Sequence, residues 1–405
     1  MSLLSMAASS LARQLSRFSS RAGRPLSKPR CRAMGELLHG IISRGSPLLS
    51  ESMRSLAAGP SPKKTIERLG YHLAQPDLQE AAWAALLYDL PRHLREDSVI
   101  AIDPTDVAKP HARKMEYLSR IRDGSTGRLE NGYWAVAAAL TRPGSREWLP
   151  IALEMYAPAR EQQGKWSENL ALLSVIRRIM QATGGRGTLA IDRGGDRIRL
   201  LEPLIDAKYH FTIRQRGDRM VLWQGREMLV REVAEEIRCR TRVEEKQKGK
   251  KRVRFLGSTT VRLPSRPDIP LSLLISRTPG HDPMMLLSTH TGKGREHHLR
   301  LLSQYRARWR VEEAIAFMKQ RLQWEDFRVL KWERMKSLSR LLCLAAYFLV
   351  SRLGQGRGET ATLRALVEVA RPIFALPEQP LWAAVTGLQH LWRARGPPAQ
   401  LQRAA

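Results

Sequence analysis

The spacing of hydrophobic and polar positions changes more than once along this chain. From 64 to 95, apolar residues recur at helical spacing, as at Leu69, Leu73 and Trp83. Beyond Ser98, short continuous apolar runs predict buried strands, and helical spacing returns between them. The predicted strands are 99–102, 133–140, 148–155, 188–191 and 209–213, and the predicted helices are 166–182 and 197–207. Strands and helices that alternate in this way predict an α/β core, whose first part covers 96–213.

Residues 214–298 are predicted to form a β-rich insertion. Strand-like runs alternate there with turns, at 220–223, 253–256, 259–263, 271–275 and 284–287. The stretch from Arg238 to Arg254 holds nine basic and two acidic residues, so the insertion should have a basic rim. Helical spacing resumes over 299–355, which we assign to the remainder of the core. Residues 356–405 are predicted to be a helical C-terminal tail.

The longest apolar run, 341–350, lies between Arg340 and Arg352. A helix that crosses a membrane needs about 20 apolar residues, so this run predicts a buried core helix and no membrane segment. Hydrophobic residues make up 43% of the 405 residues, enough to build the cores of two or three domains. The three cysteines form no CxxC pair, which disfavours structural zinc and a disulfide framework and fits a reducing cytoplasm.

The charge balance points to a polyanionic partner. Lys and Arg number 68 against 39 Asp and Glu, a net charge of +29. Nucleic acid is the commonest partner of so basic a protein, while an anionic membrane and a general basic bias are the alternatives. Residues 1–95 are basic and helical in pattern, which suits binding to DNA ends. No acidic residue precedes Glu36, and this Arg- and Ser-rich start mimics a mitochondrial transit peptide. We favour a flexible basic arm, or a start codon placed too early.

Two predicted strands end in the same way, with Ala-Ile-Asp. The strand at 99–102 leads into Asp103, and the strand at 188–191 leads into Asp192. Strands that are apolar on both faces lie in the middle of a sheet, and α/β proteins bind ligands at the carboxyl edge of such strands. Two adjacent carboxylates would repel each other unless a divalent cation joined them, and oxygen ligands suit Mg²⁺ or Mn²⁺. Asp also caps turns and helices, and Asp106 and Asp196 are alternative ligands.

A third acid lies in the helical pattern of 304–322. Val311, Ile315, Met318 and Leu322 form its core-facing stripe. A second stripe runs beside it, and its members are Tyr305, Arg308, Glu312 and Lys319. Cations around one carboxylate suit a site that holds phosphate beside a metal ligand, although a solvated face on which Glu312 pairs with Arg308 is the alternative. Glu313 lies about 100° round the helix from Glu312 and off this stripe.

These residues resemble a known family. The spacing of Tyr305, Arg308, Glu312 and Lys319 fits the Y-R-E-K signature of the IS4-type insertion-sequence transposases, and Asp103 and Asp192 look like the two aspartates of that family's DDE triad. The resemblance covers about 98–350. It implies a ribonuclease-H-like core that a β-rich insertion interrupts before the Glu-bearing helix. The class expected is therefore α/β, with a helical N-terminal DNA-binding region and a helical C-terminal tail.

The resemblance also implies a chemistry and a set of partners. Asp103, Asp192 and Glu312 would bind two Mg²⁺ or Mn²⁺ ions, which would activate the attacking water or 3′-hydroxyl and stabilise the leaving oxygen. Tyr305, Arg308, Lys319 and, beside Asp192, Arg193 would contact DNA phosphates. The substrate would be double-stranded DNA, both the terminal inverted repeats of the element and the target. A homodimer would pair the two ends, in the bacterial cytoplasm at the nucleoid.

One departure from the family concerns hairpin chemistry. Some relatives cut through a DNA hairpin and hold a flipped base against a Trp just ahead of the last strand of the insertion. The corresponding stretch here, 284–287, contains no Trp, and Trp223 is the only Trp of the insertion and suits its core. We therefore expect either no hairpin or another stacking side chain. A stand-alone metal-dependent nuclease of the same fold and a DNA-binding derivative without catalysis remain the alternative functions.

Overall fold

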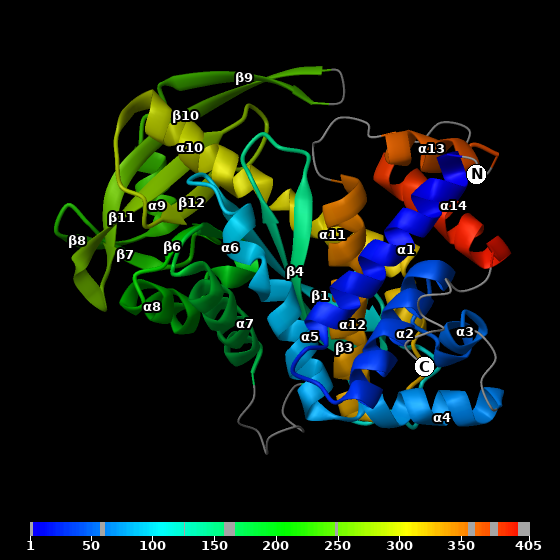
Figure 1. Cartoon of the computed structure of the whole chain (residues 1–405). Helices are drawn as coiled ribbons and strands as arrows, with labels where there is room; N and C mark the ends of the chain where they lie inside the picture. The colour runs from blue at the N-terminus through cyan, green and yellow to red at the C-terminus, as the bar shows by residue number, and fades with distance from the viewer. Residues whose placement is uncertain are drawn as a thin grey trace.

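The computed structural model describes residues 3–56, 61–124, 126–157, 167–247, 250–354, 361–372 and 380–395. One large mixed sheet runs through the protein, and helices cover it on both faces and at one end (Figure 1). The strand order is β2-β3-β1-β5-β6-β12-β11-β10-β7-β8, with β4 paired to β3 and β9 paired to β10. The mixed α/β class predicted from the sequence is confirmed.

The first part of the sheet is built on β1, Val99–Ala108. It pairs antiparallel with β3, Leu129–Thr141, and parallel with β5, Thr188–Ile191. The other strands here are β2, Ser119–Arg122, β4, Trp148–Tyr156, and β6, His210–Arg214. β5 ends at Ile191, whereas β1 continues beyond Asp103 to Ala108. The sequence placed the end of that strand too early because Pro104 and Asp106 interrupt the apolar run.

The insertion continues the same sheet rather than forming a separate one. β12, Met284–Ser288, pairs antiparallel with β6, and β11, Arg266–Arg277, pairs with β12. The runs predicted at 253–256 and 259–263 are one strand, β10, Lys250–Leu263. The remaining elements are β7, Met220–Trp223, β8, Arg226–Leu229, α9, Val230–Glu236, and β9, Thr241–Gln247. β9 and β10 form a ribbon that projects from the sheet and carries the basic stretch (Figure 1).

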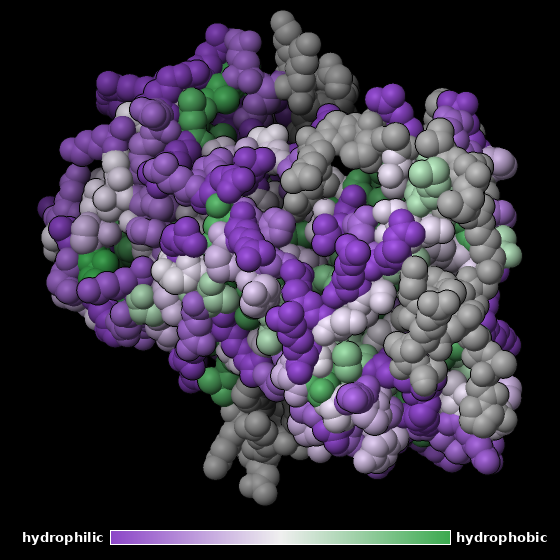
Figure 2. Space-filling view, viewed as in Figure 1, coloured by the Kyte–Doolittle hydropathy of each residue, from purple (hydrophilic) through white to green (hydrophobic). Residues whose placement is uncertain are grey.

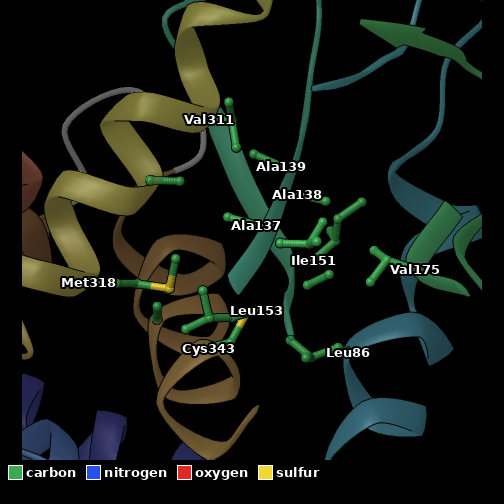
Figure 3. Close-up of a cluster of buried hydrophobic side chains, with 14 of the residues drawn as sticks. Leu86, Ala137, Ala138, Ala139, Ile151, Leu153, Val175, Val311, Met318 and Cys343 are labelled. Atoms are coloured by element: carbon green, nitrogen blue, oxygen red, sulfur yellow. The ribbon is translucent and has the colours of Figure 1, made fainter. Parts of the chain in front are cut away.

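Helices sandwich β3 and β4 because both strands are apolar on both faces. Figure 3 shows Val311 and Met318 of α11, Trp309–Arg321, on one side of these strands and Val175 of α7, Glu168–Thr183, on the other. Ala137, Ala138 and Ala139 of β3 lie between them and are buried. Small alanine side chains let the helices approach the sheet closely. α11 is thereby held alongside β1, and α8, Ile198–Asp206, follows β5.

The helix predicted over 304–322 is in fact broken. α10, Gly294–Ala307, ends just before Arg308, and α11 begins at Trp309. At the junction Arg308 N donates to Tyr305 O (3.1 Å) and Val311 N donates to Arg308 O (3.0 Å). These i to i−3 bonds tighten the turn and redirect the chain. The single four-residue stripe was therefore wrong in part: Tyr305 belongs to α10, and Glu312 and Lys319 belong to α11.

The N-terminal and C-terminal helices pack together around α12, Trp332–Leu349. Those before β1 are α1, Leu3–Ala22, α2, Lys28–Arg44, α3, Leu49–Arg54, α4, Pro62–Leu73, α5, Pro76–Tyr88, and α6, Leu90–His93. Those after α12 are α13, Ala361–Ala370, and α14, Pro380–Arg395. Figure 1 shows α1 beside α13 and α14, and Trp392 Nε1 donates to Ala8 O (3.2 Å). Residues 356–360, 373–379 and 396–405 of the predicted tail lie outside the described residues.

The interpretation of the first residues as a flexible basic arm is wrong. Leu11, Leu15 and Phe18 of α1 are buried, and the Phe18 ring lies 6.1 Å from the ring of Tyr347 on α12. Their spacing of three to four residues forms an apolar stripe, which the many Ser and Arg residues of this segment obscure.

The segment Trp332–Gly354, α12 with the π-helical turn that follows it, is long and apolar enough to cross a membrane by length and composition. However, 83% of its apolar window is buried inside the protein, as in a core helix. The face seen in Figure 2 is largely hydrophilic, with small separate hydrophobic areas. The core helix predicted from 341–350 is therefore present within α12.

Candidate active site

Asp103 and Asp192 lie side by side where β5 ends, Asp103 within β1 and Asp192 just after β5. The parallel register pairs Ile102 of β1 with Ile191 of β5, and each of these residues directly precedes an aspartate. The expectation that two adjacent strands end in Asp is met for β5, which ends just before Asp192, whereas β1 continues through Asp103 to Ala108. Because parallel strands share one carboxyl edge, both carboxyl groups emerge at the same edge of the sheet.

Glu312 reaches the same place from α11. It lies in the first turn of that helix, which packs on β1, β3 and β4. Burial raises the pKa of the Asp103 carboxyl to about 7; Arg308 opposes this rise, and the charges of Asp192 and Glu312 add to it. The Asp103 carboxyl therefore lies within electrostatic range of both Asp192 and Glu312. Carboxylates gathered in this way need a compensating cation.

Arg308 is the protein's own cation at this position. Its Nη2 donates to Glu312 Oε1 (2.6 Å), and its Nη1 lies 3.6 Å from Asp103 Oδ1. The guanidinium is mostly buried, with 13% of the side chain exposed. The pairing of Glu312 with Arg308 that the sequence offered as an alternative is present, but the same guanidinium also faces Asp103. It is thus part of the acid cluster rather than of a solvated helix face.

Asp192 is held by the backbone that follows it. Gly194 N donates to Asp192 Oδ1 (2.7 Å), so the side chain caps the short helix η1, Arg193–Gly195. A Cβ added at Gly194 would lie 2.9 Å from Asp192 Oδ1, closer than such atoms approach without displacing one another. The capping role weighed from the sequence is therefore real, and it also fixes the carboxylate. Arg193 is exposed beside it.

The alternative acids have other partners. Asp196 accepts from Arg219 Nε (2.5 Å) and from Arg216 N (2.8 Å), and none of its side chain is exposed. It ties the turn after β5 to the turn after β6. Glu313 pairs with Arg310 on another side of α11, as its place off the stripe predicts. Asp106 pairs with Lys319 (3.1 Å).

The other residues predicted to contact DNA, Lys319 and Tyr305, lie on either side of Glu312 in the sequence. Lys319 lies farther along α11 and also faces Glu325 Oε1 (3.1 Å). Tyr305 packs against a small apolar cluster shared by the insertion and α10, which contains Leu256, Leu274 and Leu286. Its ring lies 5.9 Å from the Arg308 guanidinium. Tyr305 and Lys319 thus lie on opposite sides of Glu312 along the chain.

The insertion offers no tryptophan toward the acids. Trp223 is partly buried against the core, and its Nε1 donates to Thr259 Oγ1 (2.9 Å). Residues 284–287 lie within β12, between β6 and β11. The sequence analysis did not identify Glu325 and Lys109. Near the end of β1, Glu325 faces Lys319, and Lys109 donates to the backbone oxygen of Glu325. Glu325 follows the end of α11 by a few residues, where helical periodicity gives no guide to position.

The donor chemistry of the site suits a hard divalent cation, because its three acids offer only oxygen. Within the described part of the chain, no group of three or more His, Cys, Asp and Glu side chains has the geometry to hold a metal ion. The Arg308 guanidinium lies against Asp103 and Glu312 and supplies positive charge there. The oxygen donors of the acids thus suit a metal by their chemistry, while in this structure Arg308 is the cation that Asp103 and Glu312 face.

Comparisons with known proteins place this geometry in context. The family described as "Transposase DDE domain" matches residues 94–349, which include all three acids. No curated protein matches the chain. Among solved structures, the chain is similar to a piggyBac transposase in a synaptic complex with hairpin DNA. The identity is 11% and the TM-score 0.45, over 93% of this chain and 73% of that chain.

Proposed function

We propose, from the premise that this chain belongs to the DDE-domain transposases, that it is a DNA transposase of the IS4 type with Asp103, Asp192 and Glu312 as its catalytic acids. It binds the terminal inverted repeats of its element, cuts the strands there and joins them to target DNA. The observation that carries the proposal is the pairing of Ile102 with Ile191, which delivers two aspartates to one edge, together with the coupling of Asp103 to Glu312.

The order of elements supports a ribonuclease-H-like core. The resemblance implies such a core with a β-rich insertion before the Glu-bearing helix. Strands β7 to β12 lie between β6 and the α10–α11 pair, and Glu312 follows them on α11. Because β12 pairs with β6, the insertion is fastened to the sheet that carries the aspartates.

Asp103, Asp192 and Glu312 would hold the divalent metal, Mg²⁺ or Mn²⁺ and two ions in our proposal. When bound, the metal supplies Lewis-acid activation of the nucleophile and stabilises the leaving oxygen. The protein's own residues do the rest. The backbone N–H of Gly194 holds the Asp192 carboxylate in place. Burial of Asp103 excludes water around it and makes an uncompensated charge costly, which favours the arrival of a cation.

The basic side chains bind and orient the DNA. Arg308 offers a planar guanidinium that suits a phosphate oxygen pair, and it would be free to contact one if a metal held Asp103 and Glu312. Lys319, Tyr305 and Arg193 lie on α11, α10 and η1, the elements that carry or adjoin the acids, and would contact phosphates there. Joining two element ends requires two active sites, so the working form is a homodimer on paired ends, acting in the bacterial cytoplasm at the nucleoid.

A cleavage assay tests the proposal. Its substrate is a duplex that carries the inverted repeat bracketing the gene, incubated with the full chain and Mg²⁺, Mn²⁺ or Ca²⁺. We expect strand cleavage at the repeat terminus with Mg²⁺ and Mn²⁺ and loss of cleavage on chelation. Uniform degradation with no preference for the terminus would favour the stand-alone nuclease, and binding without cleavage in any metal would favour the inactive derivative.

A further inference from the structure

Lys319 is held between two carboxylates. Its Nζ lies 3.1 Å from Asp106 Oδ2 on β1 and 3.1 Å from Glu325 Oε1 on the short helix η2, Trp324–Asp326. The Lys319 side chain is 20% exposed and that of Asp106 is 13% exposed. The ammonium donates a hydrogen bond to Asp106 Oδ2 and forms an ion pair with Glu325, and since it has three N–H donors it can still donate to a further acceptor.

Glu325 is in turn fastened to the end of β1. Ala108 N donates to Glu325 Oε1 (2.9 Å). Lys109 Nζ donates to the backbone oxygens of Glu325 and Phe327 and lies 3.6 Å from the centre of the Phe327 ring. Lys109 is buried. The carboxylate that faces Lys319 is therefore fixed by backbone as well as by charge, and the Lys109 ammonium offsets the negative charge of the group.

The Lys319–Asp106 pair is a second contact between α11 and β1, farther along both elements than the acid cluster. Lys319 lies seven residues beyond Glu312 on α11, about 10.5 Å along the helix axis. Asp106 lies three residues beyond Asp103 on β1, about 10 Å along the strand. α11 packs on β1, and the two elements meet at two places: Arg308, just before α11, faces Asp103, and Lys319 faces Asp106. The ammonium thus lies at a set distance from the acids.

Building on the proposed function, we propose that Asp106 and Glu325 are positioning residues that fix the Lys319 ammonium for contact with a DNA phosphate beside the cut. A free lysine is a flexible point charge, and ordering it on DNA costs rotamer freedom. Here the two carboxylates have already ordered it in the protein. The ammonium can still donate to the phosphate.

A coupled set of substitutions in the full chain tests this inference. The variants are Lys319→Ala, Asp106→Asn and their combination, and the probe is the duplex that carries the inverted repeat. Lys319→Ala should reduce the slope of log affinity against log salt by about one. Asp106→Asn should weaken binding and raise KM by about three- to tenfold, with a smaller change in kcat. In the Lys319→Ala background, Asp106→Asn should have no further effect on either quantity.

Glu368→Gln is the matched control, since it removes a carboxylate from the exposed ion pair with Arg371 on α13. It should leave affinity and cleavage unchanged, which excludes a simple effect of net charge. An Asp106→Asn effect of equal size with and without Lys319 would overturn the inference, because a merely structural pair acts independently of the lysine's contact. If Asp106→Asn does not fold, Glu325→Gln carries the same test, because its amide oxygen still accepts from Ala108 N.

The proposed function and the positioning role of Asp106 and Glu325 are contradicted by different results. A wild-type chain that does not cleave the duplex with Mg²⁺ or Mn²⁺ overturns the assignment of the acids, while the coupling is still measured by DNA binding. Cleavage by the wild type with an unchanged salt slope in Lys319→Ala overturns the positioning role and leaves the acids in place.

Discussion

Ile102 of β1 lies directly beside Ile191 of β5 in the parallel part of the sheet. This pairing brings the next residue of each strand, Asp103 and Asp192, to one edge although 89 positions separate them in the numbering (192 − 103). The third acid, Glu312, lies on α11, a helix that packs on β1, β3 and β4. The predictions below test whether this convergence is catalytic and which neighbouring residues support it.

Replacement of Glu312 by Gln should abolish strand cleavage and leave binding to the repeat duplex intact. The amide keeps the shape of the side chain but removes the charge that a metal requires. Glu313→Gln is the control, since Glu313 pairs with Arg310 away from the acids, and it should cleave at close to the wild-type rate. Cleavage by Glu312→Gln in Mg²⁺ at the wild-type rate, or an inactive Glu313→Gln, would show that the wrong acid has been assigned.

Gly194→Ala should reduce cleavage strongly without unfolding the protein. The added Cβ would lie 2.9 Å from Asp192 Oδ1, so the carboxylate must move from its place on the Gly194 N–H. Gly70→Ala on α4 is the control, because its Cβ would meet Arg334 only at 3.5 Å, an ordinary contact. The cleavage rates and thermal unfolding temperatures of both variants test this prediction. A Gly194→Ala variant with normal activity would mean that the position of Asp192 is not critical.

Asp196→Ala should destabilise the fold by about 3 kcal/mol, because it leaves the Arg219 guanidinium in a largely buried place without its carboxylate. The protein that remains folded should still bind divalent metal. The control is Asp206→Ala, which breaks the exposed pair with Arg266 and should change unfolding little. Denaturant unfolding and metal titration measure the two effects. Loss of metal binding with no loss of stability would instead identify Asp196 as a ligand.

His39 should make the protein less stable as the pH falls below about 6.5. Burial, aided by the charge of Arg44, lowers its pKa to about 4, and neither ring nitrogen has a hydrogen-bond partner among the described residues. Above the unfolded pKa of 6.5 both states are neutral and nothing is lost. Between 6.5 and about 4 the unfolded chain takes up the proton first, so stability decreases by up to about 1.4 kcal/mol per pH unit.

The variant His39→Phe, which keeps a ring against Trp392, tests this effect of pH. Its free energy of unfolding should depend less steeply on pH across that window than that of the wild type. Parallel curves for the two proteins would show that His39 does not remain neutral in the folded state.

The sequence alone located the strands that carry the acids, because a buried parallel strand is apolar on both faces; the first charge marked the end of β5 but not that of β1, which continues to Ala108. It also indicated the insertion, whose short runs and turns differ from the segments on either side. It could not show the break at Arg308, since Arg308 has helical backbone angles and only the hydrogen bonds reveal the tightened turn. The family match covers the acids, but their catalytic roles remain predictions.

The pattern of hydrophobic and polar residues could not predict contacts between segments that are far apart in the sequence. Glu325 follows the end of α11 by a few residues, and only the fold brings it to Lys319. The burial of α1 could not be predicted for a related reason. Its apolar stripe packs against α13, α14 and Tyr347 of α12, which lie near the other end of the chain. Periodicity reveals which face of a helix is buried, but not which element buries it.

The most direct test of the central claim is a titration of the full chain with Mn²⁺, followed by the electron paramagnetic resonance signal of the free ion. Asp103→Asn, Asp192→Asn and Glu312→Gln are measured beside the wild type, with Glu313→Gln as the control. If the three acids share the metal, each of the three substitutions weakens binding by at least about tenfold and the control does not. Equal Mn²⁺ binding by the wild type and all three variants would contradict the account.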